Sequence, residues 1–380
     1  MNLRRSLDGI GRGLFVTGQL ATRDILGEEA FHRMISHERR RTERSHKPFL
    51  LMLLDMGDVM SADNGTISLR KILNVLPLVT RETDVVGWYK NDLVVGAMLT
   101  EIDLEEKKHI QNTMLARVSS TLQDNLSVEQ FNQLSISFHW FPEEWQQILS
   151  QRRNAAVLYP DLAKRDRARK LFRILKRAMD IFGSLVALIL ASPIFALVAL
   201  AIKLTSRGPI LFKQQRAGQY GVPFALLKFR SMHSDNNNNS HKEYVWKLIS
   251  GVAEKKPCNG NGQGVYKLTS DPRITSVGAF LRKSSLDELP QFINVLKGEM
   301  SLVGPRPPID YELEKYDLWH RRRVMEAKPG ITGLWQVNGR NRLAFDEMVR
   351  LDLMYARSWS PWLDLKILLR TPRAVVEGAH

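Results

Sequence analysis

Apolar and polar positions follow each other along the first third of the chain in blocks that predict strands and helices in turn. Short apolar runs bounded by polar residues are typical of buried strands, and longer stretches with apolar positions three or four apart are typical of helices. Because the two kinds of block alternate, the pattern predicts a layered α/β domain. The expected elements are a strand at Lys47–Met56, a helix at Ser68–Thr83, a hairpin at Asp84–Thr100, a helix at Leu104–Asp124 and a strand at Leu134–Pro142.

One long apolar segment stands out further along the chain. Residues 181–202 carry no charge, which is long enough for a helix to cross the roughly 30 Å hydrocarbon core of a bilayer. Ser192 and Pro193 stand at its middle, and because proline removes a backbone donor and clashes with the preceding turn, a sharp bend is expected there. Both flanks are basic, with Lys164–Arg177 before the segment and Lys203, Arg207, Lys213 and Arg216 after it.

The basic flanks predict how this segment meets a membrane. Cationic residues favour the cytoplasmic side, so two basic flanks predict a chain that enters and returns as a re-entrant helix-break-helix in one leaflet. A kinked helix that crosses the bilayer is the alternative, because proline is tolerated in such helices. Leu171, Phe172, Ile174 and Leu175 alternate with the charges of the preceding stretch, which suits an amphipathic helix on an anionic membrane surface.

Composition and charge narrow the class of partner. The chain has 380 residues, of which 44% are hydrophobic, and a net charge of +15, which fits a folded two-domain protein with a polyanionic partner. No nucleic-acid-binding motif accompanies the charge, so we expect membrane lipid and a phosphorylated substrate, and no nucleic acid. The single cysteine, Cys258, excludes an intramolecular disulfide and fits a reducing compartment. The N-terminal residues lack the apolar core of a signal peptide.

Two adjacent carboxylates, Asp287 and Glu288, lie in the stretch LRKSSLDELPQFINVLKG. Asp287, or Ser285 with Glu288 as a capping box, could cap the helix that starts near Pro290. Alternatively, an ionised aspartate at a helix start can attack phosphorus, while its neighbour helps to hold Mg²⁺, which prefers one or two carboxylates with substrate phosphate oxygens. Capping explains one acid, but it does not explain the second acid or the cations around the pair.

Groups suited to a diphosphate accompany these acids in the sequence. Lysine offers phosphate a compact charge and arginine a bidentate fork, and Arg306 stands between two prolines, which favours a fixed position in a site. A solvated strand end is the alternative for Lys228, and simple turns are the alternative for Gly304 and Gly330. The candidate phosphate- and nucleotide-binding residues are Lys228, Arg230, Arg282, Arg306, Gln336 and Arg340.

Several long motifs follow each other in order from Met179 onward. They are the Ser192-Pro193 break, GPILFKQQRAG (208–218), LLKFRSM (226–232), DPRITSVGAFLRKSSLDELPQFINVLKGEMSLVGPRP (271–307), PGITGLWQVNGR (329–340) and LDLMYARSWSPWLDLKILLRT (351–371). With these motifs, somewhat over half of the chain resembles the bacterial sugar transferase family, the monotopic polyprenyl-phosphate phosphoglycosyl transferases.

This resemblance implies an activity. Members of the family move a sugar-1-phosphate from a UDP-sugar to membrane polyprenyl (undecaprenyl) phosphate and release UMP, which starts an exopolysaccharide, an O-antigen or another lipid-linked glycan. The resemblance implies that Asp287 carries the phosphosugar covalently, that Glu288 belongs to a Mg²⁺ site, and that the enzyme lies on the cytoplasmic face of the bacterial inner membrane. No motif identifies the sugar, the polymer, the oligomeric state or glycan-assembly partners.

The N-terminal part resembles a GGDEF-type (nucleotide-cyclase-like) domain in the order of its elements. The signature position holds YKNDLV (89–94), where Lys90-Asn91 replaces the glycine pair and Leu93 replaces the acid after Asp92. Glycines let a backbone approach phosphate and a two-metal site needs its carboxylates, so the resemblance implies a degenerate domain that serves interaction or regulation. Asp55 remains as consistent with a turn acid as with a metal ligand.

The expected architecture is α/β, with a degenerate GGDEF-like domain at 1–150, a basic amphipathic linker helix at 151–178 and a membrane-embedded, mainly helical transferase domain at 179–380. An insert at 233–264 interrupts the last domain, and its helical piece Glu243–Ala253 could cover the site as a lid. Two other functions stay open, a non-catalytic membrane scaffold that recruits glycan-assembly enzymes and a receptor whose N-terminal domain binds a cyclic dinucleotide. The intact acid pair counts against the scaffold, and the absent glycine pair counts against the receptor.

Overall fold

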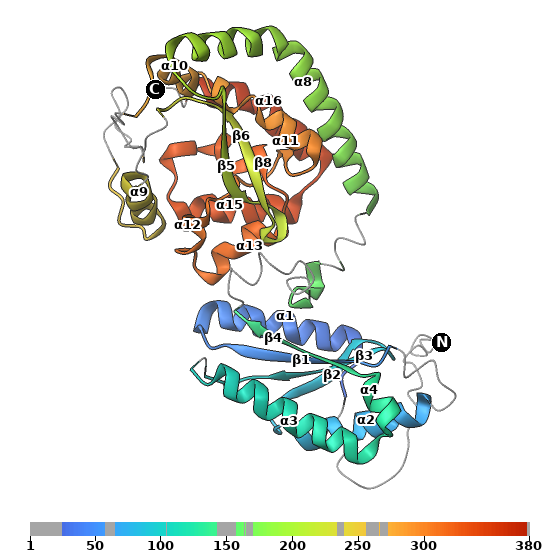
Figure 1. The fold of residues 1–380 in the computed structure, drawn as a ribbon. Coiled ribbons are helices and arrows are strands. Elements are labelled where there is room, and N and C mark those ends of the chain that lie inside the picture. The colour runs from blue at the N-terminus through green and yellow to red at the C-terminus, as the bar shows by residue number, and fades with distance from the viewer. Residues whose placement is uncertain are drawn as a thin grey trace, which may run out of the picture. The chain divides into compact units, whose positions relative to one another are not determined.

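The computed structural model in Figure 1 describes residues 25–57, 65–103, 105–142, 157–162, 164, 170–233, 239–255, 266 and 273–377. Cys258, residues 165–169 of the basic stretch Lys164–Arg177 and much of the insert at 233–264 lie outside the described residues. The chain forms two compact units, residues 1–32 with 50–138 and residues 33–49 with 139–380. We call them the N-terminal and the C-terminal unit.

The N-terminal unit is a layered α/β domain, as the hydrophobic pattern predicts. Its sheet has the strand order β2-β3-β1-β4, and Figure 1 shows α3 along one face of the sheet. The strands of the sheet are β1 (Phe49–Asp55), β2 (Val85–Lys90), β3 (Val94–Leu99) and β4 (Ser135–Phe141), and the helices within the unit are α2 (Gly65–Val79), α3 (Lys107–Asn125) and α4 (Val128–Asn132). Helix α1 (Glu28–Ser45) begins in this unit, and its residues from Arg33 onward belong to the C-terminal unit. The expected strands, helices and hairpin are therefore confirmed, with ends shifted by a few residues.

The β2–β3 hairpin is shaped by a close packing contact. Gly87 and Gly96 lie opposite each other on the two antiparallel strands. A Cβ atom on Gly87 would lie 2.6 Å from the ring of Phe31, and one on Gly96 would lie 2.8 Å from it. The two glycines therefore make room for this aromatic ring on the sheet. Asp92 turns the chain between the strands with φ 58°, in the left-handed region that Asp tolerates better than most residues.

The C-terminal unit is mainly helical and contains two pairs of short strands. β5 (Leu211–Ala217) and β6 (Pro223–Phe229) are antiparallel, whereas β7 (Ser301–Val303) and β8 (Gly330–Thr332) are parallel. The helices are α8 (Lys170–Thr205), α9 (Asn239–Ile249), α10 (Ser276–Lys283), α11 (Gln291–Lys297), α12 (Asp310–Leu313), α13 (Leu318–Glu326), α14 (Leu334–Asn338), α15 (Phe345–Ser358) and α16 (Pro361–Glu377), with 3-10 turns η2 (Gln219–Gly221), η3 (Leu286–Glu288) and η4 (Arg340–Arg342).

Helix α8 contains the whole apolar segment in one 36-residue helix. The expected break at Ser192-Pro193 is therefore a bend within a continuous helix, which follows an arc in Figure 1. Pro193 has no N–H to donate to the carbonyl of Ile189, four residues earlier, and the Ser192 hydroxyl donates to that carbonyl instead, at 2.8 Å. Because a side chain satisfies the acceptor that the proline leaves free, the helix continues.

Most apolar side chains of α8 are exposed. In the part of the chain that the structure describes, α8 is the one helix long and apolar enough to cross a membrane. An exposed apolar surface of this size marks contact with an apolar partner such as a bilayer. The exposed large side chains are Leu171, Phe172, Ile174, Leu175, Ile181, Phe182, Leu185, Val186, Ile189, Leu190, Ile194, Leu197, Leu200 and Leu204.

The basic start of α8 is fixed to the rest of the C-terminal unit. Lys176 donates to Asp364 at 2.6 Å, and Arg177 donates to two carbonyls at the end of α11, both at 2.6 Å. Asp180 accepts from the backbone N–H of Leu302 at 2.9 Å. Lys176 and Arg177 were expected to face anionic lipid, but they bind acceptors inside the protein. The apolar neighbours Ile174 and Leu175 are exposed.

A buried asparagine fixes α11 against the free edge of β6. Asn294 is fully buried, and its Oδ1 accepts from the N–H of Leu227 at 3.0 Å while its Nδ2 donates to the carbonyl of Ala225 at 2.8 Å. One amide side chain therefore satisfies two strand groups that would otherwise be unpaired, which would cost about 1–3 kcal/mol each if buried. Since α11 follows Asp287 and Glu288 directly, this contact also sets their distance from β6.

Candidate active site

Asp287 and Glu288 lie in the 3-10 turn η3, directly before α11. Ser285 enters this turn with φ 56°, in the left-handed region. Pro290 is the N-cap of α11, and no side chain makes a capping hydrogen bond there. The capping interpretation is therefore wrong for both acids, although Pro290 lies at the helix start as predicted. The turn holds the two acids in place, and neither carboxylate is used to cap the helix.

Glu288 is paired with Lys228 on β6. The Lys228 Nζ lies 2.9 Å from the Glu288 Oε1. Burial raises the pKa of Glu288, but the positive charges of Lys228, Arg306 and Arg340 outweigh this effect and hold the pKa at about 2. Glu288 is therefore ionised at any physiological pH. Lys228 is mostly buried beside it, so the alternative of a solvated strand end does not hold for this lysine.

The environment of Asp287 shifts its pKa in the opposite direction. Burial raises the pKa of the Asp287 carboxyl, Lys228 opposes that shift, Glu288 adds to it and Arg282 opposes it, and the net direction is upward. The helix start was expected to favour the ionised form, but Asp287 precedes the N-cap and burial dominates. Two adjacent acids with pKa values pushed apart are typical of sites in which the acids do different chemical work.

Three arginines approach the acid pair from different elements. Arg282 lies in the last turn of α10, Arg306 follows β7 and Arg340 opens η4, and all three line one cavity. Arg340 donates to the hydroxyl of Ser285 at 3.3 Å, and Ser285 is the residue that enters the acid turn. The folded chain therefore brings these three candidates and Lys228 around the two acids, although they are spread over 113 positions of the sequence (from 228 to 340, both ends counted).

The loop that carries Arg306 is fixed by a close approach of two backbone segments. A Cβ atom on Gly304 would lie 2.2 Å from the carbonyl oxygen of Lys328, and one on Gly330 would lie 2.1 Å from the backbone nitrogen of Gly304. Neither distance leaves room for a side chain. The two glycines were considered as simple turn residues, but contact between the ends of β7 and β8 requires them. This contact fixes the direction in which the chain leaves toward Arg306.

Gln336 supplies an oxygen that suits a cation. It lines the same small pocket as Glu288 and Lys228. Its Nε2 donates to the carbonyl of Ile331 at 3.2 Å, whereas its Oε1 is buried and has no partner among the described residues. Those residues contain no group of three His, Cys, Asp or Glu that could hold a metal. The Glu288 carboxylate and the Gln336 Oε1 are oxygen ligands that fit Mg²⁺. This ion takes one or two protein oxygens and completes its coordination shell with phosphate and water oxygens.

Arg230 is the candidate that lies apart from this group. Its Nη2 donates to the carbonyl and to the hydroxyl of Ser206 at 2.8 and 2.7 Å, immediately after the end of α8. This arginine therefore binds the backbone where the apolar helix ends. A role for Arg230 at the phosphates stays a prediction.

Arg216 is a site residue that the sequence analysis missed. It is buried, lines the pocket of Glu288, and donates to the carbonyl of Pro307 at 2.8 Å. Burial lowers its pKa to about 10, so it remains a cation at neutral pH. The sequence analysis treated Arg216 only as part of the basic flank of the apolar segment. Its position inside the motif GPILFKQQRAG was the signal that could have identified it.

Comparison with known proteins identifies similar sequences for the C-terminal unit. The family model described as bacterial sugar transferase matches residues 171–378. The chain is 44% identical over 206 residues to the "Galactosyl transferase CpsE" of Streptococcus agalactiae serotype III, which covers 54% of this chain and 43% of that protein. It is 43% identical over 218 residues to the "Undecaprenyl-phosphate galactose phosphotransferase" of Salmonella typhimurium, which covers 56% of this chain and 43% of that protein.

A third relative is named for a different sugar. The chain is 41% identical over 211 residues to the "UDP-glucose:undecaprenyl-phosphate glucose-1-phosphate transferase" of Escherichia coli, which covers 52% of this chain and 39% of that protein. The matched segment thus spans less than half the length of each of these three relatives.

Among solved structures, "The crystal structure of a DGC protein from Thermotoga maritima" is 20% identical and covers 35% of this chain and 96% of that chain, with a TM-score of 0.27. A TM-score this low does not establish a shared fold. The GGDEF-like nature of the N-terminal part therefore stays a prediction.

Proposed function

Because the chain belongs to the bacterial sugar transferase family, we propose that it transfers a sugar-1-phosphate from a UDP-sugar to polyprenyl (undecaprenyl) phosphate and releases UMP. The observation that carries this proposal is the acid pair, in which buried Asp287 adjoins an ionised Glu288 that Lys228 contacts at 2.9 Å. Relatives are named for galactose and for glucose, so UDP-galactose and UDP-glucose are the donors to test first.

The proposed reaction has two displacements at the same phosphorus. The carboxylate of Asp287 attacks the β-phosphorus of the UDP-sugar, the bond from that phosphorus to the bridging oxygen breaks, and UMP leaves with the bridging oxygen. A phosphate oxygen of polyprenyl phosphate then attacks the aspartyl-phosphosugar, the bond to Asp287 breaks, and polyprenyl diphosphate sugar leaves. Covalent catalysis of this kind divides one difficult step into two easier ones.

The cations stabilise the charge that moves in each displacement. Phosphoryl transfer depends on positioning and on neutralising the phosphate oxygens, and fixed charges in a partly buried site act strongly. Arg282, Arg306 and Arg340 are the groups available for the diphosphate. Lys228 pairs with Glu288 at 2.9 Å, next to Asp287, and is available to contact the phosphate under attack. Buried Arg216 lines the same small pocket as Arg306 and adds a further positive charge.

Mg²⁺ is the cofactor that we propose for this site. Glu288 and the Oε1 of Gln336 would hold it, since Glu288 is ionised and that amide oxygen is buried without a partner among the residues described. When bound, the cation supplies additional positive charge for the diphosphate. Asp287 remains the nucleophile in this arrangement.

The rate of UMP release should fall in acid because of Asp287. The carboxylate must be ionised to attack, and its pKa is raised above the ordinary value, so kcat should be lost as the pH falls through that raised pKa. Glu288, with a pKa of about 2, stays ionised throughout this range. Lys228→Met removes a charge that lowers the pKa of Asp287, so its acidic limb should move to higher pH. The measurement is kcat of wild type and Lys228→Met between pH 4 and 8. An acidic limb at the same pH in these two proteins would contradict the assignment of the limb to Asp287.

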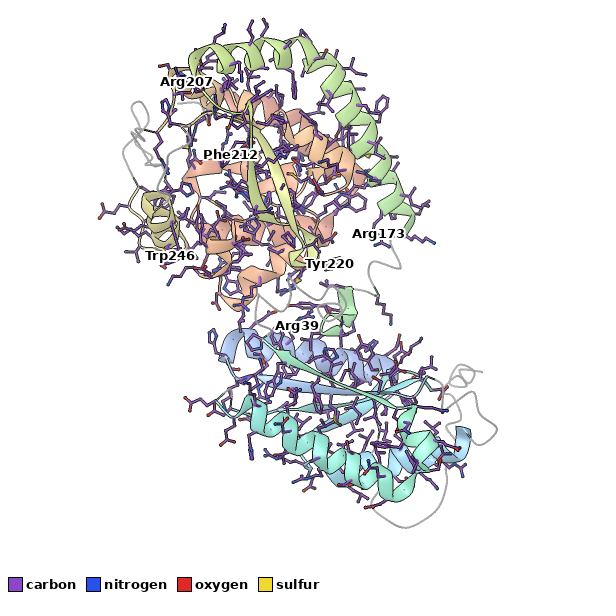
Figure 2. The ribbon with its side chains drawn as sticks, in the orientation of Figure 1. Arg39, Arg173, Arg207, Phe212, Tyr220 and Trp246 are labelled. Atoms are coloured by element: carbon purple, nitrogen blue, oxygen red, sulfur yellow. The ribbon has the colours of Figure 1, made fainter. Side chains whose placement is uncertain are left out.

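We propose that α8 lies in one leaflet with both ends on the cytoplasmic side. Its exposed apolar surface and its basic flanks support this topology. Arg173 and Arg207 mark the two ends of the segment (Figure 2), so each can be replaced by cysteine in a Cys258→Ser background. A membrane-impermeant maleimide should label both positions in inverted vesicles and neither in right-side-out vesicles. Labelling of one position in each preparation would show that α8 crosses the membrane.

The direct test of the reaction is UMP release by the full chain in detergent or nanodiscs. UDP-galactose, UDP-glucose and UDP-acetamido sugars are supplied singly with undecaprenyl phosphate and Mg²⁺. We expect UMP from one donor and a lipid-linked sugar in equal amount. No UMP from any donor, from folded protein that binds lipid, would favour the scaffold function. For the N-terminal unit we propose interaction or regulation.

A further inference from the structure

A cavity of about 220 Å³ lies at the start of α8. Its walls come from α8, η2, the residues that follow α13 and the end of α15. It shares no lining residue with the pocket of Glu288 or with the cavity of the three arginines. Its volume is below the roughly 300–1,000 Å³ that is usual for sites of drug-sized molecules. The cavity is therefore a separate site, with room for a small headgroup rather than for a whole sugar nucleotide.

The charged residues of this cavity leave an excess of positive charge. Two of them are neutralised by direct partners, because Lys176 lies 2.6 Å from Asp364 and Arg322 donates to Glu326 at 2.9 Å. Arg177 donates to two backbone carbonyls, which are neutral and do not offset its charge. An anionic ligand would balance the remaining charge. The charged lining residues are Arg173, Lys176, Arg177 and Lys328, with the acids Asp180 and Glu326.

Lys328 lines the cavity and lacks a partner for its side chain. It is half-buried, and its ammonium group makes no hydrogen bond or ion pair with any residue that the structure describes. Burial lowers the pKa of Lys328, and the charge of Arg177 lowers it further. Asp180 opposes this shift and Lys176 adds to it, and the net direction is downward. A phosphate oxygen at the Nζ would supply the missing acceptor and stabilise the charged form.

The cavity adjoins the exposed apolar surface of α8. Trp359 lines the cavity, and its ring lies against that of Phe172, with the two centroids 6.3 Å apart. Phe172 is 51% exposed, and Ile174 and Leu175 beside it are exposed as well. Figure 2 labels Arg173 in this part of α8. Tryptophan is enriched where membrane proteins meet the bilayer interface, so a ligand held by the cations has an apolar surface next to it.

We infer that this cavity binds the phosphate headgroup of an anionic glycerophospholipid, with Lys328 and Arg173 at the phosphate and the acyl chains along the exposed residues of α8. Basic pockets beside membrane helices are a recognised type of site for anionic headgroups. Free phosphate would meet the same cations, but it would make no use of the apolar surface. The inference uses the membrane position proposed for α8, and it does not depend on the transfer reaction.

Calorimetry with dioctanoyl phosphatidylglycerol tests the inference on the full chain in a neutral detergent. Lys328→Met keeps an unbranched side chain and removes the charge, so it should weaken binding about tenfold. Arg173→Gln should weaken binding as well, and it decides the question if Lys328→Met fails to fold. The matched controls Lys203→Met and Arg207→Gln remove exposed cations at the other end of the apolar segment, and they should bind like the wild type. Dioctanoyl phosphatidylcholine, which has the same chains and no net charge, should bind at least about tenfold more weakly than phosphatidylglycerol.

Other outcomes would overturn the lipid site. Equal phosphatidylglycerol affinity in wild type, Lys328→Met and Arg173→Gln would do so, and so would an equal loss in the two control variants, which would indicate general surface charge. Inorganic phosphate that binds as tightly as the lipid and competes with it would show a site for free phosphate instead. Farnesyl phosphate stands for the polyprenyl acceptor, and a loss of its affinity in Lys328→Met, with phosphatidylglycerol unaffected, would place the acceptor here. Sugar transfer is not measured in these experiments, so a failure of the proposed reaction would leave their result unchanged.

Discussion

Asp287→Asn should abolish transfer, with kcat for UMP release lower by at least about 10⁴-fold, the scale expected when a covalent nucleophile is removed. The amide keeps the shape of the side chain, but it cannot attack phosphorus. Asp287 is buried in a turn that is fixed by Ser285 and by the start of α11, so the fold should survive an isosteric change. The measurement is single-turnover UMP formation from the preferred UDP-sugar.

Asp310→Asn is the matched control for this variant. Asp310 is an exposed aspartate in α12, and its replacement should leave kcat within about a factor of two, as surface substitutions usually do. UMP and UDP affinities of Asp287→Asn should remain close to wild type, which separates loss of chemistry from loss of binding. Turnover by Asp287→Asn at the wild-type rate would remove Asp287 from the mechanism.

Glu288→Gln should lower kcat about 10²–10³-fold, the range found when one electrostatic contact to a transition state is removed. The amide cannot hold Lys228 by charge, and it is a weaker partner for Mg²⁺. The same variant should shift the acidic limb of kcat to lower pH, because the charge of Glu288 raises the pKa of Asp287. A fall in rate together with this shift is a result that simple unfolding does not produce.

Glu314→Gln is the control for Glu288→Gln. Glu314 forms an exposed pair with Lys242 at 3.5 Å, and exposed pairs contribute little, so neither the rate nor the acidic limb should change. If the acidic limb of kcat for Glu288→Gln lies at the same pH as that of the wild type, or at a higher pH, the charge of Glu288 does not raise the pKa of Asp287 as the structure indicates.

The hydrophobic pattern was sufficient to predict the N-terminal unit and the long apolar helix. Both depend on local periodicity, which the sequence carries directly. Pro193 was predicted to disturb the helix at this point. The helix nevertheless continues, because the hydroxyl of Ser192 donates to the carbonyl of Ile189 that Pro193 leaves without a donor. A proline can cause either a break or a bend in a helix. Which of the two occurs depends on whether another group donates to the carbonyl that the proline leaves unpaired.

The candidate site was predicted in its chemistry and less well in its geometry. Asp287 was expected at a helix N-cap, yet the left-handed backbone at Ser285 inserts a 3-10 turn before the helix, and no side-chain pattern specifies that dihedral angle. Lys228 and Arg230 look equivalent in the sequence, but β6 ends at Phe229, and the chain carries Arg230 to the end of α8.

Residues whose partners are distant in the sequence were the hardest to assign. Lys176 was interpreted as a lipid-facing charge because its partner, Asp364, is 188 positions away. Arg216 was counted as a membrane flank, whereas its contact with Pro307 and its place in the wall of the Glu288 pocket show that it faces the site.

The central claim is that Asp287 becomes covalently attached to the phosphosugar, and mass spectrometry of the trapped protein tests it most directly. The full chain is incubated with its UDP-sugar and Mg²⁺ without polyprenyl phosphate, then quenched and digested. We predict a sugar-phosphate adduct on the peptide that contains Asp287, about one UMP released per chain, and loss of the adduct when polyprenyl phosphate is added. UMP that forms only after polyprenyl phosphate is added, with no adduct at any time, would contradict the account and indicate direct transfer between the two substrates.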